Sequence, residues 1–376
     1  MKLSEKIQSI AGSKTVAFTA LIQDLRREGK AVIDLAVGEP DFDTPSAVIE
    51  STKAALDARK TRYSPVKGLP ELRAQLATGF RGYDVDNILL TNGSKQALYM
   101  IFQVICDPSD EVIIPVPFWV SFVEQVKLAG GRPVLVDTQN HQLDNEAIER
   151  AITPRTKAIL INSPNNPSGA VYPITDIEKI SRMAVEHNLF IVADEAYKAF
   201  VYDGCKHASP FDIEAVRNRT IVVRSFSKSY SMTGFRIGYV AAPRPMIAAL
   251  SKIQSHLTGN VCTFAQYGAL AVESLDDRWL IARQAEMQRK RDIAYQYASR
   301  FFRCTEPRGA FYLFPDVSMV LKSGETAREL AERLLNEAGV AVVAGEAFGV
   351  AKHIRISFAV SDDELKKGFE QIAGVL

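Results

Sequence analysis

A lysine placed just after an apolar run is the clearest candidate for chemistry in this chain. Lys228 follows the run TIVVRS (220–225), and Arg236 comes a little further along. Open α/β sheets bind their ligands at the carboxyl ends of their strands. A lysine at such a place can form a Schiff base with an aldehyde cofactor, while Ser225 and Arg236 can hold a phosphate group. On its own, Lys228 fits a solvated surface lysine better, because most lysines lie on the surface.

A carboxylate ends another apolar run. Asp194 closes LFIVAD (189–194), so we expect its side chain to be at least partly buried and to need a charged or hydrogen-bonding partner. The pyridinium nitrogen of pyridoxal phosphate is such a partner, and protonation of that nitrogen makes the ring an electron sink. Tyr197 could reach the phenolic oxygen of the ring. The alternatives are a helix N-cap for Asp194 and core packing for Tyr197.

Two loop segments present further polar groups. The prolines of INSPNNPSG (161–169) fix an extended turn, on which Asn166 can donate to an acceptor on a cofactor ring. In TNGSKQALYMIF (91–102) a helix opens, and the free amides and the positive dipole end at Ser94 and Lys95 make an anion site suited to a phosphate. The alternatives are a plain turn and an ordinary junction between a loop and a helix.

An aromatic residue and an arginine complete the candidates. Trp119, just after the run EVIIPV, could stack on a flat cofactor ring, although a tryptophan in an apolar run is more often part of a core. Arg355 lies inside HIRISFA (353–359) and must find an anion there; its rigid fork suits a substrate carboxylate. A structural salt bridge is an equal alternative for Arg355.

Alternating strand and helix patterns must position these residues. The strand-like runs are rich in Val and Ile and continuous, as in strands covered on both faces. We therefore predict an α/β fold with a mostly parallel sheet between two layers of helices. The predicted strands are 111–116, 132–137, 157–162, 189–194, 220–225 and 237–242. The predicted helices between them are 94–106, 118–129, 144–151, 174–187 and 245–257.

The last third of the chain predicts a second, smaller α/β unit. It contains a long charged helix over 278–302, and Ser361 with Glu364 forms a capping box before a final helix. Its other predicted elements are strands at 309–317, 340–345 and 353–359 and a helix at 325–339. The predicted division is a large domain at 40–277 and a small domain made of 1–39 and 278–376.

Composition excludes several classes of function. The net charge is +1, from 45 basic and 44 acidic residues, which argues against binding of nucleic acid by bulk charge. The longest strongly apolar run (112–120) is too short to cross a bilayer, and no signal-peptide pattern opens the sequence, so we expect a cytoplasmic protein. The four cysteines are scattered and are expected to be free thiols, and no metal-ligand spacing occurs.

Together these motifs closely resemble the class I/II aminotransferases of fold type I, which use pyridoxal 5′-phosphate. The resemblance covers essentially the whole chain and is nearest to the bacterial aspartate aminotransferase branch, subgroup Iγ. The strings that carry it are GEPDFDTP (38–45), YSPVKGLPELR (63–73), SPNNPSG (163–169), DEAY (194–197) and SFSKSYSMTGFRIGY (225–239).

The resemblance implies roles for the residues that face the cofactor. Lys228 carries the cofactor and then moves the proton between the substrate and the cofactor. Asp194 pairs with the ring nitrogen, Asn166 and Tyr197 contact the phenolic oxygen, and Trp119 stacks on the ring. The residues implied to surround the phosphate are Ser94, Lys95, Ser225 and Arg236.

The resemblance also implies how substrate and subunits meet. Gly38 and Arg355 bind the α-carboxylate, Gly38 through its backbone at a place where a side chain would collide. Tyr63 reaches the phosphate of the neighbouring subunit, which implies a homodimer with shared sites. Lys95 is associated with the distal carboxylate of aspartate or glutamate.

These matches favour an aspartate aminotransferase, and they leave alternatives open. Some relatives accept prephenate with the help of a lysine at a position that here looks like Ala11, although Lys14 is near. The segment 255–265 holds no arginine clamp. The alternatives are an aromatic, kynurenine or alanine aminotransferase, a C–S lyase, and a non-catalytic ligand sensor.

Overall fold

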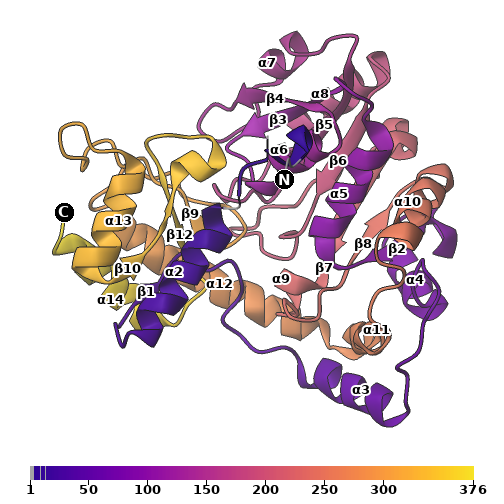
Figure 1. The fold of residues 1–376 in the computed structure, drawn as a ribbon, viewed down its shortest axis with the longest axis horizontal. Helices are drawn as coiled ribbons and strands as arrows, with labels where there is room; N and C mark the ends of the chain where they lie inside the picture. The colour runs from indigo at the N-terminus through magenta and orange to yellow at the C-terminus, as the bar shows by residue number, and fades with distance from the viewer. Residues whose placement is uncertain (1–3, 9, 13) are drawn as a thin grey trace.

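The larger part of the protein is built on a seven-stranded sheet (Figure 1). The structure, a computed structural model, describes residues 4–8, 10–12 and 14–376. The strand order is β2-β8-β7-β6-β5-β3-β4; β8 runs antiparallel to both of its neighbours, and the other pairs are parallel. The strands are β2 (Ile88–Thr91), β3 (Glu111–Val116), β4 (Arg132–Asp137), β5 (Thr156–Asn162), β6 (Phe190–Asp194), β7 (Thr220–Ser225) and β8 (Gly238–Ala241).

Neighbouring residues of each strand face opposite layers of helices. On β3, Val112 and Ile114 belong to one core cluster with residues of α5 (Gly93–Ile105) and α10 (Arg244–Leu257). Ile113 belongs to another cluster with residues of α8 (Ile174–Glu186). Successive side chains of a strand point to opposite faces, so a sheet covered on both sides needs continuous apolar runs. The predicted three-layer fold class with a mostly parallel sheet is confirmed.

Shorter helices surround this sheet. Thr52 on one of them donates within its own helix to the carbonyl of Val48, which belongs to a core cluster that includes Leu90 of β2. The remaining helices of the larger part are α3 (Ser46–Asp57), α4 (Pro70–Ala77), α6 (Ser121–Leu128), α7 (Asn145–Arg150), α9 (Phe226–Ser229) and α11 (Thr263–Leu270).

The smaller part combines the two ends of the chain. Near its N-terminus lie α1 (Glu5–Gln8) and α2 (Lys14–Arg27), and β1 (Ile33–Asp34) pairs in parallel with β10 (Val340–Ala341). A second sheet consists of three antiparallel strands in the order β11-β12-β9. Its strands and the helices around it are β9 (Tyr312–Leu313), β11 (Val343–Ala344), β12 (Ile354–Ser357), α12 (Asp277–Ala298), α13 (Ala327–Ala338) and α14 (Asp362–Ala373). The capping box of Ser361 and Glu364 is present.

The structure corrects two expectations and adds one strand. The strand expected at 340–345 is two strands, because the chain changes its partner from β1 to β12 at Val342. The strand expected at 309–317 is reduced to β9, since Ala310 has φ +57° and the chain leaves the sheet after Leu313. Strand β2 was not predicted, because its four residues merge with the following apolar helix.

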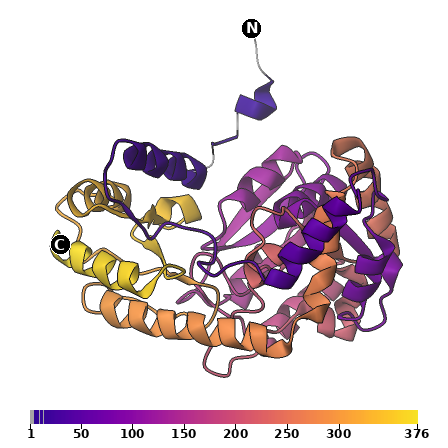
Figure 2. The same cartoon turned by 90° about the horizontal axis from the view of Figure 1, so that it is seen from below.

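The long helix α12 runs from the larger part to the smaller one (Figure 2). Core residues of α12, of β9 and of the segment that follows β6 belong to a single apolar cluster. The two parts therefore share a core. The domain boundaries at 40 and 278 stay a prediction.

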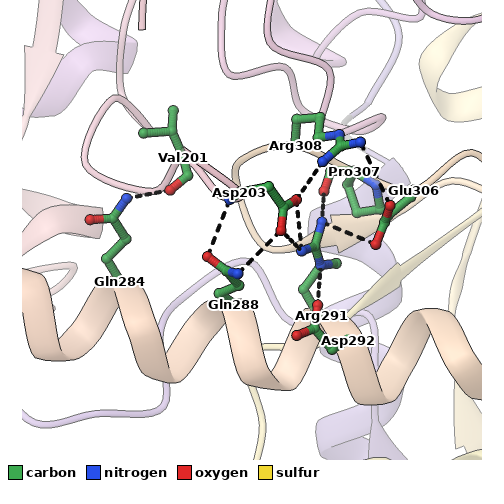
Figure 3. Close-up of polar contacts among 9 residues, drawn as sticks. All are labelled: Val201, Asp203, Gln284, Gln288, Arg291, Asp292, Glu306, Pro307 and Arg308. Atoms are coloured by element: carbon green, nitrogen blue, oxygen red, sulfur yellow. Dashed lines mark hydrogen bonds and ion pairs between the residues drawn. The ribbon is translucent and has the colours of Figure 1, made fainter. Parts of the chain in front are cut away.

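A polar cluster around the buried guanidinium of Arg291 holds α12 against the larger part (Figure 3). The guanidinium of Arg291, with its side chain 1% exposed, donates to both carboxylate oxygens of Asp203 at 2.8 Å. Arg308 donates to the same carboxylate at 2.7 Å, and Glu306 lies 3.5 Å from Arg291. The cluster thus fixes residues 306–308, which lead into β9.

Among the described residues, none of the helices is both long and apolar enough to cross a membrane. The four cysteines are free thiols, and Cys106 is buried.

Candidate active site

The carboxyl ends of the central strands open into a cavity of about 310 Å³ between the two parts of the molecule. Every predicted site residue except Tyr63 lines it. These residues come from widely separated motifs: Gly38, Ser94, Lys95, Trp119, Asn166, Asp194, Tyr197, Ser225, Lys228, Arg236 and Arg355. The side chain of Tyr63 is on the surface instead, 97% exposed.

Lys228 lies on α9, the single helical turn that follows β7. Its side chain is half-buried, and Nζ donates to the backbone carbonyl of Gly38. Burial lowers the pKa of Lys228 to about 8, and nearby Arg355 and Arg236 act in the same direction. The interpretation as a solvated surface lysine is therefore wrong. An amine with this pKa has a larger neutral, nucleophilic fraction near neutral pH than an ordinary lysine has.

Asp194 is the last residue of β6 and is 4% exposed. Its Oδ1 accepts a hydrogen bond from the backbone N–H of Ala196 at 3.2 Å, within a turn. No helix begins at Asp194, so the interpretation as a helix N-cap is wrong. Burial raises the pKa of Asp194 to about 7. A carboxylate in this state gains from a cationic partner inside the cavity.

The next residue, Glu195, is neutralised by its own partners. Arg224 donates to it at 2.8 Å, and Ser209 donates to its other oxygen. Because Arg224 precedes Ser225 at the end of β7, this ion pair joins the ends of the two strands that lead to Asp194 and Lys228. The pair leaves Asp194 as the carboxylate that faces the cavity.

The anion-binding end of the cavity lies at the start of α5. Gly93 has φ +74°, and a Cβ there would lie 2.5 Å from Nη2 of Arg236. A Cβ on Gly238 would lie 2.9 Å from the backbone nitrogen of Ser94. Both positions need glycine so that Arg236 and β8 can approach the helix start. The amides at the positive end of this helix and the Arg236 guanidinium therefore converge on one place.

Lys95 and Trp119 lie beside that anion site. The Lys95 ammonium is 5.0 Å from the centre of the Trp119 ring, and burial lowers its pKa, assisted by Arg236. Trp119 is half-buried and packs edge-to-face on Phe122 at 5.4 Å, so it borders both the core and the cavity. Ser225 caps α9 by accepting from the N–H of Ser227 at 3.1 Å.

Arg355 sits at the opposite end of the cavity and is 4% exposed. It donates to the side-chain oxygen of Asn166 at 3.0 Å and to the carbonyl of Ala36 at 2.8 Å. Within the described part of the chain no carboxylate forms an ion pair with it, and its buried Nε has no hydrogen-bond partner. The alternative of a structural salt bridge is therefore wrong. A buried cation with neutral partners can accept the carboxylate of a ligand.

Gly38 is placed as expected, beside Arg355 and Lys228 in the cavity. A Cβ on Gly38 would contact the Tyr312 hydroxyl at 3.7 Å, an ordinary van der Waals distance. The expected collision is therefore not with the protein itself.

Sequence analysis missed three polar residues that line the same cavity. Asn162 accepts from the N–H of Asn166 at 3.0 Å and so supports the turn that presents it. Ser227 stands one residue before Lys228. Tyr312 bonds through its hydroxyl to that of Tyr197 at 2.9 Å. The only sequence signal was a phenol inside the apolar run GAFYLF, which reads as core.

The residues present fit pyridoxal 5′-phosphate. Its phosphate matches the start of α5 with Arg236, and its ring nitrogen matches the buried Asp194 carboxylate. Its phenolic oxygen matches the donors of Asn166 and Tyr197, and its aldehyde matches the amine of Lys228.

Comparison with known proteins gives full-length similarity. A family model described as aminotransferase class I and II matches residues 30–372. The aspartate/prephenate aminotransferase of Thermus thermophilus is 42% identical, with 100% of this chain and 98% of the relative covered. The aspartate aminotransferase of Geobacillus stearothermophilus is 39% identical, over 99% and 98%. A solved structure of the Thermus thermophilus aspartate aminotransferase with maleate matches with a TM-score of 0.96, at 40% identity and covering 100% of both chains.

Proposed function

We propose a reaction for this chain on the premise that it belongs to the class I and II aminotransferases, a family of pyridoxal 5′-phosphate enzymes. The proposed reaction moves the amino group of aspartate or glutamate to a 2-oxo acid, in two half-reactions that share one site. The observation that carries this proposal is Arg355, a buried cation without a carboxylate partner in the described chain, in the same cavity as Lys228 and Asp194.

In this proposal the residues divide the chemistry among them. When bound, the cofactor supplies an aldehyde that takes up the amino group and a ring that withdraws electrons. Asp194 holds a proton on the ring nitrogen by its charge. Lys228 would hold the cofactor through its amine and would act as the general base that removes the proton from the substrate Cα.

The other residues bind and orient. Arg355 and the backbone at Gly38 hold the α-carboxylate, Asn166 and Tyr197 donate to the phenolic oxygen, and Trp119 covers one face of the ring. The phosphate is held by a group of residues that meet at the start of α5: Ser94, Lys95, Ser225 and Arg236.

Lys95 is our candidate for the distal carboxylate. Its ammonium is near the ring of Trp119, and it borders both the site and a second cavity of about 650 Å³. The lining of this second cavity is mostly apolar and includes Tyr99, Phe118 and Leu257. A lysine is a flexible point charge rather than a planar fork, so selection for acidic substrates should be looser than an arginine gives. We therefore also expect slower turnover of aromatic or aliphatic amino acids.

Replacing Lys95 with alanine should separate acidic from apolar donors. We expect the KM for aspartate to rise at least about ten-fold, since a hydrogen bond to a charged group is lost. The KM for phenylalanine should stay within about three-fold, because its side chain makes no ion pair. The measurement is steady-state kinetics over a panel of amino donors, with Lys127→Ala on α6 as the control for loss of a nearby lysine.

Two outcomes of this panel would contradict the assignment. If alanine, kynurenine or an aromatic amino acid is preferred by the unmodified protein over both acidic donors, the aspartate specificity is wrong. If both KM values rise together in Lys95→Ala, the lysine serves the cofactor phosphate instead, which a weaker affinity for the cofactor would show.

Prephenate stays outside the proposal. Ala11 stands where some relatives carry a lysine, and its N–H donates to Glu124 at 3.1 Å. The side chain of Lys14 lies outside the part of the structure that is described.

We further propose a homodimer with composite sites, in which Tyr63 completes the phosphate site of its partner. Its side chain is 97% exposed, on a loop held in place by its neighbours. The carbonyl of Arg62 accepts from Thr263 at 2.8 Å, and the hydroxyl of Ser64 accepts from Gln266 at 3.0 Å. A phenol presented so far from its own chain is suited to reach a second subunit.

Mixing two defective subunits tests the shared site. Equal amounts of Lys228→Ala and Tyr63→Phe subunits should form hybrids in which one site has Lys228 from one chain and Tyr63 from the other. We expect about a quarter of native turnover after exchange, because half of the dimers are hybrids with one intact site. If Tyr63 served its own subunit, the mixture would never exceed the activity of the Tyr63→Phe dimers. Native mass spectrometry, which resolves the hybrid from the two homodimers by mass, checks that the subunits have exchanged.

A further inference from the structure

A closed circuit of contacts joins the two ends of the active site, and Tyr312 is the member that sequence analysis missed. Arg355 donates to the Asn166 oxygen at 3.0 Å, and the Asn166 amide nitrogen donates to the Tyr197 hydroxyl at 3.5 Å. The Tyr197 hydroxyl meets that of Tyr312 at 2.9 Å. The Tyr312 ring then lies under the Arg355 guanidinium, 4.3 Å from its carbon to the ring centre.

The Asn166 end of this circuit has a fixed hydrogen-bond direction, whereas either phenol can donate in the bond between Tyr197 and Tyr312. The Asn166 oxygen is used by Arg355, so its nitrogen is the atom that faces Tyr197, as a donor. Burial raises the pKa of Tyr312, and burial together with Tyr312 raises that of Tyr197, so both phenols keep their protons. If Tyr312 also donates, both lone pairs of the Tyr197 oxygen are filled. The single Tyr197 proton is then free to point into the cavity.

We propose that Tyr312 is a positioning residue of the aminotransferase site with two separable roles. Its hydroxyl directs the Tyr197 O–H into the cavity, toward the phenolic oxygen of the cofactor. Its ring holds the Arg355 guanidinium in the plane that receives the substrate α-carboxylate. The inference rests on the proposed function and adds a residue that couples its cofactor end to its substrate end.

The backbone around Tyr312 is built to hold such a position. The N–H groups of Arg308 and Gly309 both donate to the carbonyl of Gly169, at 3.0 and 2.9 Å, at the end of the turn that carries Asn166. The N–H of Ala310 donates to the carbonyl of Phe200 at 3.0 Å, just after Tyr197. A Cβ on Gly309 would lie 2.7 Å from that carbonyl. Three of the four members of the circuit, Asn166, Tyr197 and Tyr312, therefore sit on interlocked segments.

The polar cluster of Figure 3 anchors this arrangement from behind. Arg308, which begins the segment leading to Tyr312, shares the Asp203 carboxylate with Arg291 of α12. The Tyr202 N–H donates to the Arg308 carbonyl at 2.8 Å. A positioning residue needs support of this kind, since its contribution depends on holding a hydroxyl and a ring in one place.

Two substitutions at Tyr312 separate its roles. Tyr312→Phe keeps the ring and removes the hydroxyl, whereas Tyr312→Leu removes both. For Tyr312→Phe we expect kcat to fall about five- to ten-fold, and the pH titration of the visible cofactor absorption to shift. The dissociation constant of maleate, measured by calorimetry with the cofactor-loaded protein, should stay within about two-fold. For Tyr312→Leu we expect the titration shift and also a maleate dissociation constant weaker by about three- to thirty-fold.

Tyr202→Phe is the matched control, because Tyr202 lies in the same core cluster and its hydroxyl donates to the carbonyl of Ala310. It should lower thermal stability while leaving the titration and the maleate affinity unchanged. The inference is overturned if Tyr312→Phe also loses only stability, or if Tyr312→Leu binds maleate as tightly as the unmodified protein. Should Tyr312→Leu fail to fold, Tyr312→Phe alone decides the role of the hydroxyl. An unmodified protein that transfers no amino group would instead refute the proposed function.

Discussion

Lys228→Ala lowers turnover of aspartate by about four orders of magnitude or more, and the protein still binds the cofactor. The loss is large because one side chain supplies both the covalent attachment and the general base, and a general base alone contributes up to about 10⁴-fold. The affinity that remains comes from the start of α5 and Arg236, which the substitution leaves in place. Lys228 is half-buried in the cavity, and its pKa is lowered to about 8, so its amine is suited to attach the cofactor.

Borohydride reduction and peptide mapping check the attachment. In the unmodified protein the pyridoxyl group should be found on Lys228, and in Lys228→Ala on no lysine. Lys198→Ala is the matched control: its pKa is also lowered by burial, but it does not line the cavity. It should keep the label on Lys228 and most of the activity. A label on Lys95 in the unmodified protein would refute the assignment.

The second large effect is expected at Asp194. Asp194→Asn keeps the shape of the side chain and removes the charge that holds a proton on the ring nitrogen. We expect kcat to fall about a thousand-fold or more, because a buried charge aimed at a reacting ring is worth far more than one in water. Burial raises the pKa of Asp194 to about 7, so a cationic ring gains a strong partner there.

Steady-state kinetics and cofactor absorption measure this effect. Asp137→Asn is the control, since Asp137 also ends a strand of the same sheet but is exposed. It should behave as the unmodified protein does. Near-normal turnover in Asp194→Asn, with the fold intact by circular dichroism, would mean that Asp194 serves only the turn at Ala196.

The central sheet was predictable because its strands are buried on both faces, so each appears in the sequence as a continuous apolar run. β7 begins and ends where the apolar run TIVVRS does, and polar residues appear where the strand leaves the core. The same rule located Asp194 and Lys228, since strand ends in a parallel sheet collect at one edge. Arg355 was found because an arginine between two isoleucines has to meet an anion.

The smaller part was harder, since its strands are only two to four residues long and exchange partners. Val340 and Val343 look alike in sequence, yet they pair with opposite ends of the chain. Tyr312 was missed for a related reason: its importance depends on the hydroxyl of Tyr197, far away in the sequence, whereas its neighbours make it look like core. The role of Tyr63 depends on a second subunit, which no local pattern describes.

The pairing of β1 with β10 has a consequence for how the protein is made. Ile33 leaves the ribosome long before its partner Val340, because the whole of the large sheet lies between them in the sequence. The backbone carbonyls of Leu35 and Ala36 also gain their partners late, because they accept hydrogen bonds from the Ser357 N–H and the Arg355 guanidinium. Closing a loop of this length costs chain entropy, and this cost is offset only when the contacts with the later segments form. The strands of the large sheet can therefore assemble first, while the cavity wall that carries Gly38 and Arg355 is completed only after β12 has been synthesised.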